Sequence, residues 1–208
     1  MTASVSHRMR TFGTALLVVL WSATAVPVFA GSNDPAVFVK SLGDRAIIVL
    51  SDENSTPESR KSEYRRLLDE GFAVNTIGRF ALGRHWRAAT EDERAEYLDL
   101  FRAFVLDIYA ERLDSFAGET FVIIESHSLD GKDTMVNTEI GGESGPPIRV
   151  DYRVRSHDGA HKIIDVMVEG ISLIVTQRSE FASVINREGF EGLLVRLRHY
   201  DSGGSLAN

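Results

Sequence analysis

The sequence contains no cysteine in its 208 residues. Disulfide bonds, thiolate metal sites and a cysteine nucleophile are therefore excluded. A small secreted scaffold held together by disulfides is excluded for the same reason. A chain of this length can bury a hydrophobic core large enough to fold without such cross-links.

The chain also lacks an excess of basic residues. Lys and Arg number 23 against 30 Asp and Glu, which gives a formal net charge of −7 at pH 7. Without a basic cluster along the sequence, charge-driven binding to nucleic acid or to anionic lipid is poorly supported. The histidines beyond residue 30 are scattered and lack the H-E-x-x-H spacing, so we expect no metal site and no cofactor. These are His85, His127, His157, His161 and His199.

Long hydrophobic runs are absent except near the N-terminus. Residues 1–10 contain arginine but no acidic residue, and residues 11–26 form an apolar stretch that is short for a membrane span. Val28 and Ala30 then occupy positions −3 and −1 of a signal peptidase site. The pattern predicts a secretory signal peptide over residues 1–30, cleaved after Ala30. An uncleaved anchor is the alternative. The mature chain of 178 residues would carry a net charge of −9.

The first half of the mature chain has the apolar spacing of helices. Asp34 and Thr56 each precede a proline, which places a capping residue before proline at the first helical position. Residues 90–93, Thr-Glu-Asp-Glu, form a capping box. Apolar residues then recur every three or four positions, which predicts a long helix over residues 91–116.

Beyond residue 118 the apolar period changes to two. Strands are predicted over residues 120–126, 134–140, 148–155 and 162–169, and turn residues separate them. The third and fourth strands each send a row of apolar side chains to one face. This row consists of Ile148, Val150, Tyr152, Val154, Ile164, Val166 and Val168.

Such a sheet has one face that must be covered, and the helices supply the cover. The fold class predicted is therefore α+β: a helical N-terminal half packed on an antiparallel sheet, like an NTF2-like cone, with an apolar cavity between sheet and helices. Ser172 is predicted to cap a final helix that Gly189 interrupts. Residues 31–200 would form one domain, followed by a polar, disordered tail over residues 201–208.

The sequence shows no clear catalytic constellation. Gly78 and Gly83 have the spacing of a phosphate-binding loop, but Arg84 and His85 replace the required Lys-Ser/Thr pair. Asp107 lies close to the apolar stripe of the long helix, where it could act as a general base in a hydrophobic cavity. A small NTF2-like enzyme acting on an apolar substrate is therefore the alternative function. An Asp107 carboxylate in an arginine pair is the simpler interpretation of this residue.

Several stretches resemble a known family, in the right order along most of the mature chain. They are residues 77–87, Thr90, Arg94, Leu100, Phe101, residues 109–113, Gly118, Glu119, residues 164–174 and residues 177–181. The chain resembles the periplasmic lipid-binding proteins of the Mla and toluene-tolerance (Ttg2) type. These are soluble partners of an ABC transporter that moves phospholipid between the two bacterial membranes.

Some positions depart from the family pattern. His161 stands where the family commonly has Trp, and Ala73 replaces an Asp that often follows Phe72. Residues 177–185 are closer to the branch associated with hopanoid biosynthesis. The cargo is therefore either a phospholipid or a hopanoid-type lipid.

The resemblance implies a periplasmic lipid carrier rather than an enzyme. It would work as a monomer with membrane-associated transporter components. Its pocket would enclose the apolar part of the lipid and leave the head group near solvent. A structural protein with a filled core is a third possibility. The residues expected to line the pocket are Phe80, Trp86, Phe101, Phe104, Val105, Ile108, Val150, Tyr152, Val154, Ile164, Val166 and Val168.

Overall fold

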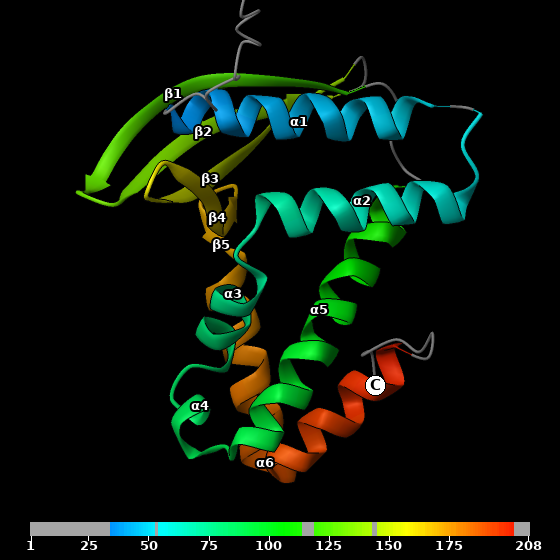
Figure 1. The fold of residues 1–208 in the computed structure, drawn as a ribbon, viewed down its shortest axis with the longest axis vertical. Coiled ribbons are helices and arrows are strands. Elements are labelled where there is room, and N and C mark those ends of the chain that lie inside the picture. Colours follow the sequence, from blue (N-terminus) through cyan, green and yellow to red (C-terminus); the bar gives the residue numbers. More distant parts are fainter. Residues whose placement is uncertain (1–33, 53, 114–118, 143–144, 202–208) are drawn as a thin grey trace, which may run out of the picture. The chain divides into compact units, whose positions relative to one another are not determined.

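The computed structural model describes residues 34–52, 54–113, 119–142 and 145–201. For residues 106–113 and 201 it describes the backbone but not the side chains. The predicted signal peptide and nearly all of the predicted tail also lie outside it. In chain order the described elements are α1 Pro35–Ser51, α2 Pro57–Gly71, α3 Val74–Leu82, α4 His85–Ala88, α5 Glu91–Leu113, β1 Thr120–Asp130, β2 Asp133–Gly141, β3 Ile148–His157, β4 Ala160–Val168, β5 Ile171–Ser172 and α6 Leu173–Asp201 (Figure 1). This order of helices and antiparallel strands confirms the α+β class.

The predicted helix caps are present as hydrogen bonds. The Asp34 carboxylate accepts from the Ala36 amide at 2.8 Å, and the Thr56 hydroxyl accepts from the Ser59 amide. At the start of α5, the Thr90 amide donates to the Glu93 carboxylate at 2.7 Å while the Glu93 amide donates to the Thr90 hydroxyl at 3.2 Å. Each bond satisfies an amide that the first helical turn leaves unpaired.

Two helices were not predicted as separate elements. Residues 74–89 contain α3 and the single turn α4, joined at Gly83. Gly83 has a φ of 57°, which is the left-handed region that glycine adopts without strain. Gly78 therefore lies within α3 and Gly83 ends that helix, so the two glycines do not form a phosphate-binding loop.

The sheet is an antiparallel meander with strand order β1-β2-β3-β4-β5. Two-residue turns at 131–132 and 158–159 join β1 to β2 and β3 to β4, and the four long strands agree with the predicted ones to within a few residues. β5 is an addition of two residues that pairs Ile171 with Val168. It follows a tight turn in which Glu169 and Gly170 both have positive φ.

A bulge in β4 corrects the predicted apolar row. Arg153 pairs with Asp165, but the next residue Val154 pairs with Ile163, so Ile164 is the extra residue. One extra residue reverses the alternation of side chains between the faces. Ile163 therefore joins Val154 in the core, and the prediction that Ile164 shares a face with Val166 is wrong.

Helix α1 covers the apolar face of the sheet. Val39 packs against Val136 of β2, Val154 of β3 and Ile163 of β4, and each of these side chains is at most 1 % exposed. Burying such a side chain contributes about 1.5–3 kcal/mol. This sheet core depends on α1, which lies along the strands in Figure 1.

Helix α5 belongs instead to a second, helical core. It packs chiefly against α6 and α3, and its Tyr97, Phe101 and Phe104 side chains are buried there with Phe181 of α6. The Phe181 ring contacts each of the other three edge-on or tilted, which favours aromatic packing. Among the helices predicted to cover the sheet, α1 therefore supplies the cover, and α5 packs on other helices.

Helix α6 changes direction at Gly189, as predicted. This residue has φ 77° and ψ 177°, a conformation restricted almost entirely to glycine. Beyond it, the apolar positions Leu193, Leu194 and Leu197 are each at most 1 % exposed and complete the helical core. The kink therefore redirects the last part of α6 onto α5.

The chain at Phe72 joins the two cores. Phe72 forms a parallel bridge with Ile163 of β4, and the Ala73 amide donates to the Ile163 carbonyl at 2.9 Å. Lys162 donates to the carbonyls of Asp69 and Glu70 at the end of α2. Phe72 packs against both cores, so it marks the boundary between helices and sheet.

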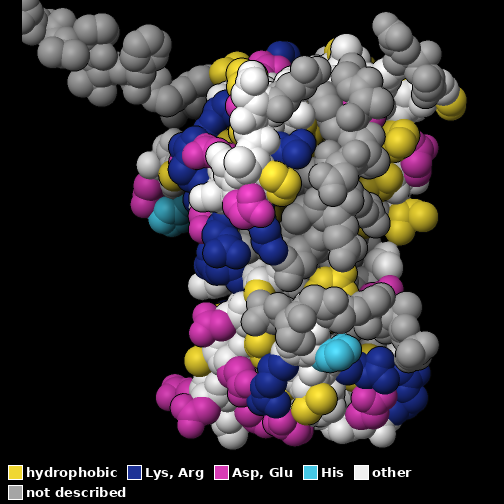
Figure 2. All heavy atoms as spheres, turned by 90° about the vertical axis from the view of Figure 1, so that its right-hand side faces the viewer, with side chains coloured by type: hydrophobic (Ala, Val, Ile, Leu, Met, Phe, Trp, Pro, Cys, Tyr) yellow, Lys and Arg dark blue, Asp and Glu magenta, His cyan; other side chains and the backbone are white. Residues whose placement is uncertain are grey.

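The surface is rich in exposed ion pairs. Arg66 pairs with Glu63 and Glu70, and Arg198 pairs with Glu96 and Glu191. Figure 2 shows basic and acidic side chains interspersed on one face of the molecule. Exposed pairs contribute only about 0–1 kcal/mol each, so the two apolar cores stabilise the fold. Within the described residues, no helix combines the length and the hydropathy needed to cross a bilayer.

Candidate functional site

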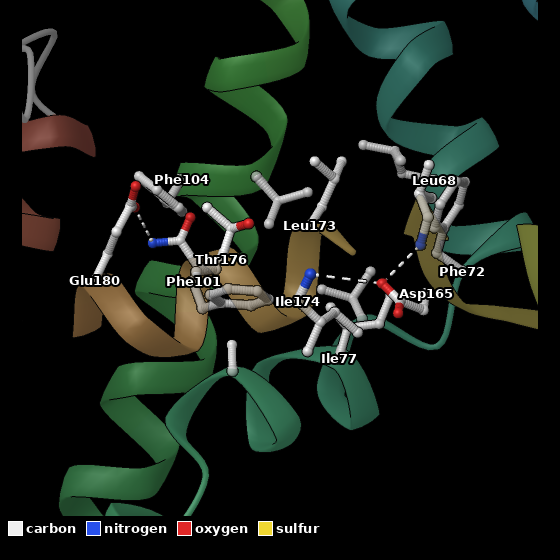
Figure 3. A pocket seen from close by; sticks show the side chains of 15 residues that line it. Leu68, Phe72, Ile77, Phe101, Phe104, Asp165, Leu173, Ile174, Thr176 and Glu180 are labelled. Carbon is white, nitrogen blue, oxygen red and sulfur yellow. Dashed lines mark hydrogen bonds between the residues drawn. The ribbon is translucent and has the colours of Figure 1, made fainter. Parts of the chain in front are cut away.

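A cavity of about 270 Å³ lies where the helical core meets β4 and the start of α6 (Figure 3). Its walls come from five elements and from Phe72, which lies between α2 and α3. Most of the side chains are aliphatic or aromatic. The lining residues are Leu68, Phe72, Val74, Ile77, Ala81, Phe101, Phe104, Val105, Asp165, Val166, Leu173, Ile174, Thr176, Gln177 and Glu180.

The helical spacing of the sequence produces the apolar walls. In α3, Val74, Ile77 and Ala81 recur at three and four residues and so face the same side. In α5, Phe104 and Val105 present their side chains to the opposite wall. Mostly apolar lining with a few polar groups is typical of small-molecule sites, whose volumes are about 300–1,000 Å³. This cavity is slightly smaller than the lower end of that range.

The polar lining residues occupy two separate places. Thr176, Gln177 and Glu180 lie on successive turns of α6, and Thr176 and Glu180 are solvent-exposed. The Gln177 amide donates to the Glu180 carboxylate at 3.1 Å, as the dashed line in Figure 3 marks. These residues form the open side of the pocket, which we call the rim.

Asp165 lies at the other end of the pocket and is engaged in capping α6. Its carboxylate accepts from the Ser172 hydroxyl at 2.7 Å and from the Ile174 amide at 3.5 Å. The Ser172 hydroxyl in turn accepts from the Val175 amide at 3.1 Å. Ser172 therefore caps the helix, as predicted, and Asp165 supports the same helix end from β4.

Burial also fixes the position of α3 against α5. The Tyr97 hydroxyl donates to the Gly78 carbonyl at 2.9 Å, and burial raises the pKa of Tyr97 well above 10.0. Gly78 has no room for a side chain, because a Cβ there would lie 2.8 Å from Phe101. The close approach at Gly78 places Ile77 and Ala81 on the pocket wall.

The structure brings together four of the residues predicted from the sequence to line the pocket. Phe101, Phe104, Val105 and Val166 lie along its walls. Ile108 belongs to α5, but its side chain lies outside the described residues, as does that of Asp107.

The other predicted residues lie elsewhere. Val150 and Val154 are buried within the sheet, and Tyr152 packs beneath α1. Phe80 and Ile164 line a neighbouring, smaller cavity of about 220 Å³ with Arg153, Arg155 and Arg178. Val168 is half-buried near the end of β4. Because α1 covers the apolar face of the sheet, most of that face is core rather than pocket wall.

Trp86 is also absent from the described pocket lining. Two guanidinium groups lie over its ring, with the Cζ atoms of Arg79 and Arg94 5.7 Å and 5.4 Å from the ring centroid. Arg94 also donates to the Trp86 carbonyl at 2.8 Å. Trp86 therefore fastens α4 to α5 through cation–π contacts.

The sequence interpretation missed the pocket residues of α2, α3 and α6. The spacing of Val74, Ile77 and Ala81 was the available signal for α3. Leu173 and Ile174 gave no such signal, because their position depends on how α6 leaves β5. Among the described residues, no group of three His, Cys, Asp or Glu could hold a metal ion.

The fold and the pocket together define an α+β protein with a hydrophobic, ligand-sized cavity. A family model described as MlaC protein matches residues 40–199, and the chain therefore belongs to the MlaC family. The resemblance to Mla and Ttg2 proteins is thus confirmed at the level of the family.

Two curated relatives carry related names. The chain is 24% identical over 136 residues to the toluene tolerance protein ttg2D of Pseudomonas putida, covering 65% of this chain and 63% of that protein. It is 17% identical over 210 residues to the intermembrane phospholipid transport system binding protein MlaC of Haemophilus influenzae, covering 97% of this chain and 98% of that protein.

A solved structure has the same fold. The phospholipid-binding protein of Ralstonia solanacearum, in complex with a phospholipid, matches with a TM-score of 0.71 at 24% identity. The match covers 84% of this chain and 99% of that chain. At this identity, the similarity establishes the fold.

Proposed function

We propose that this protein is a periplasmic lipid carrier. It holds the acyl chains or apolar body of a phospholipid or hopanoid-type lipid in the pocket and leaves the head group at the rim. It passes the lipid between inner- and outer-membrane partners of an ABC transport system. The observation that carries this proposal is the pocket of about 270 Å³ with apolar walls from α2, α3, α5, β4 and α6.

Physical chemistry supports a carrier of this kind. Each methylene group resists transfer to water by about 0.8 kcal/mol, so two ordinary acyl chains face a barrier of roughly 20 kcal/mol. A soluble carrier needs only an apolar cavity and a means of release. The names of the curated relatives, which refer to phospholipid transport and toluene tolerance, agree with this role. The signal peptide predicted over residues 1–30 agrees with export.

The pocket is small for a two-chain lipid, so loading would widen it. Its position supports this, because it lies at the boundary between two separate cores. Movement of the helical core as one body relative to β4 would enlarge the cavity without opening either core.

Lipid extraction from the purified protein tests the proposal. We expect native mass spectrometry to detect one bound lipid, and the emptied protein to take up lipid from vesicles. Val105→Trp should reduce uptake at least several-fold, because Val105 lines the pocket and a larger side chain would occupy its space. The matched control is Val195→Trp, at a valine of α6 that is 53% exposed. A protein that emerges empty and gains no lipid would refute the carrier function.

The same assay addresses the enzyme alternative. In a carrier, Asp107→Asn should leave lipid uptake unchanged, since no chemical step is required. Turnover of an apolar substrate that disappears in this variant would favour the enzyme instead.

A further inference from the structure

A second cavity adjoins the lipid pocket at its rim. It has a volume of about 410 Å³, and its described lining residues lie within 177–187 and 193–196, on the two sides of the bend at Gly189. We call it the elbow cavity. Gln177 and Glu180 line both cavities, so the rim is the boundary that they share. Figure 3 shows Glu180 at one end of the pocket, and a lipid that leaves the pocket at this end enters the elbow cavity.

The first arm of α6 presents one continuous face to both cavities. Positions that recur every three or four residues lie on the same side of a helix. The residues with this spacing that line one or both cavities are Leu173, Gln177, Glu180, Val184 and Arg187. At a rise of 1.5 Å per residue, Arg187 lies about 15 Å beyond Gln177 along the helix axis. A lipid with its apolar part in the pocket and its head group beyond the rim would follow this face toward Arg187.

The elbow cavity contains two arginines, and their guanidinium groups differ in the donors that they have left. Arg196 donates from Nε and Nη2 to the two carboxylate oxygens of Glu188, at 2.9 Å and 2.8 Å. Arg187 makes one side-chain hydrogen bond among the described residues, to the Ser183 hydroxyl at 3.2 Å, and its Nε lies 3.9 Å from the Glu188 carboxylate. A guanidinium has five N–H donors. Arg187 therefore keeps most of its donors for a ligand in the elbow cavity.

Glu180 is the acidic residue among the described residues that line the elbow cavity. It lies two helical turns before Arg187, which is about 10 Å along the axis. This separation is close to the Debye length at physiological ionic strength, and both residues are exposed. An anion in direct contact with Arg187 is therefore attracted by the near charge more strongly than it is repelled by the distant, screened one.

We propose that Arg187 binds the phosphate of a phospholipid whose apolar part occupies the pocket. This proposal rests on the proposed function and specifies the cargo as a phospholipid rather than a lipid without phosphate. The planar guanidinium can donate to two phosphate oxygens at once. The acyl chains in the pocket hold the phosphate at a high effective concentration beside Arg187, an advantage that free phosphate lacks.

Competition between two lipids with the same acyl chains tests the proposal. The emptied mature protein is offered phosphatidylcholine vesicles that contain a minor fraction of diacylglycerol, in phosphate-free buffer. Solvent extraction and mass spectrometry then give the ratio of phosphatidylcholine to diacylglycerol in the protein. Because the Arg187 side chain is 62% exposed, we expect Arg187→Gln to lower this ratio about two- to fivefold relative to wild type. Arg187→Lys keeps the charge but loses the planar pair of donors, so it should lower the ratio less.

The matched control is Arg198→Gln. Arg198 is also an exposed arginine of α6, but it pairs with Glu96 and Glu191 and is absent from the described lining of both cavities. This variant should keep the wild-type ratio. Millimolar inorganic phosphate distinguishes the lipid phosphate from a free ion, and we expect it to leave the wild-type ratio unchanged.

Three results would overturn the proposal. They are an unchanged ratio in Arg187→Gln, an equal fall in Arg198→Gln, and a wild-type ratio that millimolar inorganic phosphate lowers to that of Arg187→Gln. Each of them leaves the carrier function intact, because lipid still enters the protein. Absence of uptake of both lipids by wild type is a different result, which refutes the carrier function itself.

Discussion

At the scale of the residue, the buried carboxylates of Asp133 and Asp151 have well-defined partners. Asp133 is 1% exposed and accepts from Arg153 and Arg155 of the neighbouring strand. Asn137 and Asp151 form a second buried pair at 2.8 Å. Asp151 of β3 is thus paired across strands with Asn137 of β2. The charged side of the sheet is therefore a network of charge-assisted bonds rather than an open solvated face.

The pKa of Asp133 gives a test of this network. Hydrogen bonds from Arg155 and then Arg153 hold the pKa of Asp133 below 3.8. A lowered pKa in the folded state stabilises the protein above the ordinary pKa, and this contribution is lost as pH falls through the folded value. Asp133→Asn should lower the free energy of unfolding by about 1–3 kcal/mol at pH 7. In urea titrations, the difference from wild type should shrink below about pH 4; a constant difference would contradict this account.

Tyr97 gives the opposite pH dependence. Burial raises its pKa above 10.0, so the folded protein keeps Tyr97 protonated while the unfolded chain ionises. Stability from this group is present below pH 10.0 and is lost as pH rises further. Tyr97→Phe should cost about 1 kcal/mol at pH 7, because the bond to Gly78 is lost. Its unfolding free energy should also fall less than that of wild type between pH 9 and 11, and a parallel decline would disprove the assignment.

At the scale of the element, most helices and strands follow from local sequence, but their partners do not. The capping box at Thr90 and the alternation in residues 148–155 were sufficient to locate α5 and β3. Two features could not be predicted from the local sequence. α5 packs on helices rather than on the sheet, and the bulge at Ile164 depends on how β4 pairs with β3.

The kink in α6 is testable because it depends on one glycine. At Gly189, φ is 77° and ψ is 177°, and a side chain there is strained although a Cβ would meet nothing within 4 Å. Gly189→Ala should therefore destabilise the protein by about 1–3 kcal/mol. For a chain of this size, that corresponds to a fall in Tm of very roughly 2–10 °C. Thermal unfolding of Gly131→Ala provides a comparison for the effect of alanine alone, because Gly131 lacks a positive φ and a Cβ there also meets nothing within 4 Å.

At the scale of the whole molecule, the pocket is formed by segments far apart in the chain. Leu68 of α2, Val105 of α5, Val166 of β4 and Ile174 of α6 meet only in the folded protein. They lie between a sheet core held by α1 and a helical core held by α5 and α6. A ligand in this position would contact both cores.

Lipid loading should therefore stabilise the entire fold. A ligand that binds only the native state raises the unfolding free energy by about 2.7 kcal/mol when its free concentration is 100 times Kd. We expect the lipid-loaded protein to unfold at a Tm several degrees above that of the emptied protein. Val105→Trp should show a smaller difference between the two forms. Equal Tm values for loaded and emptied wild type would indicate that lipid lies outside the pocket.

The sequence by itself determined most of the elements of this protein, because caps, apolar periods and turn residues act over a few positions along the chain. It also determined the family, which the match over residues 40–199 confirms. The fold class followed, since an apolar sheet face needs a cover. Only the tertiary structure decided which helix supplies that cover and where the pocket lies. Val150 and Val166 have the same apolar character in sequence, yet Val150 is buried in the sheet and Val166 lines the pocket. That difference depends on which distant element packs against each side chain, and periodicity along the chain carries no information about it.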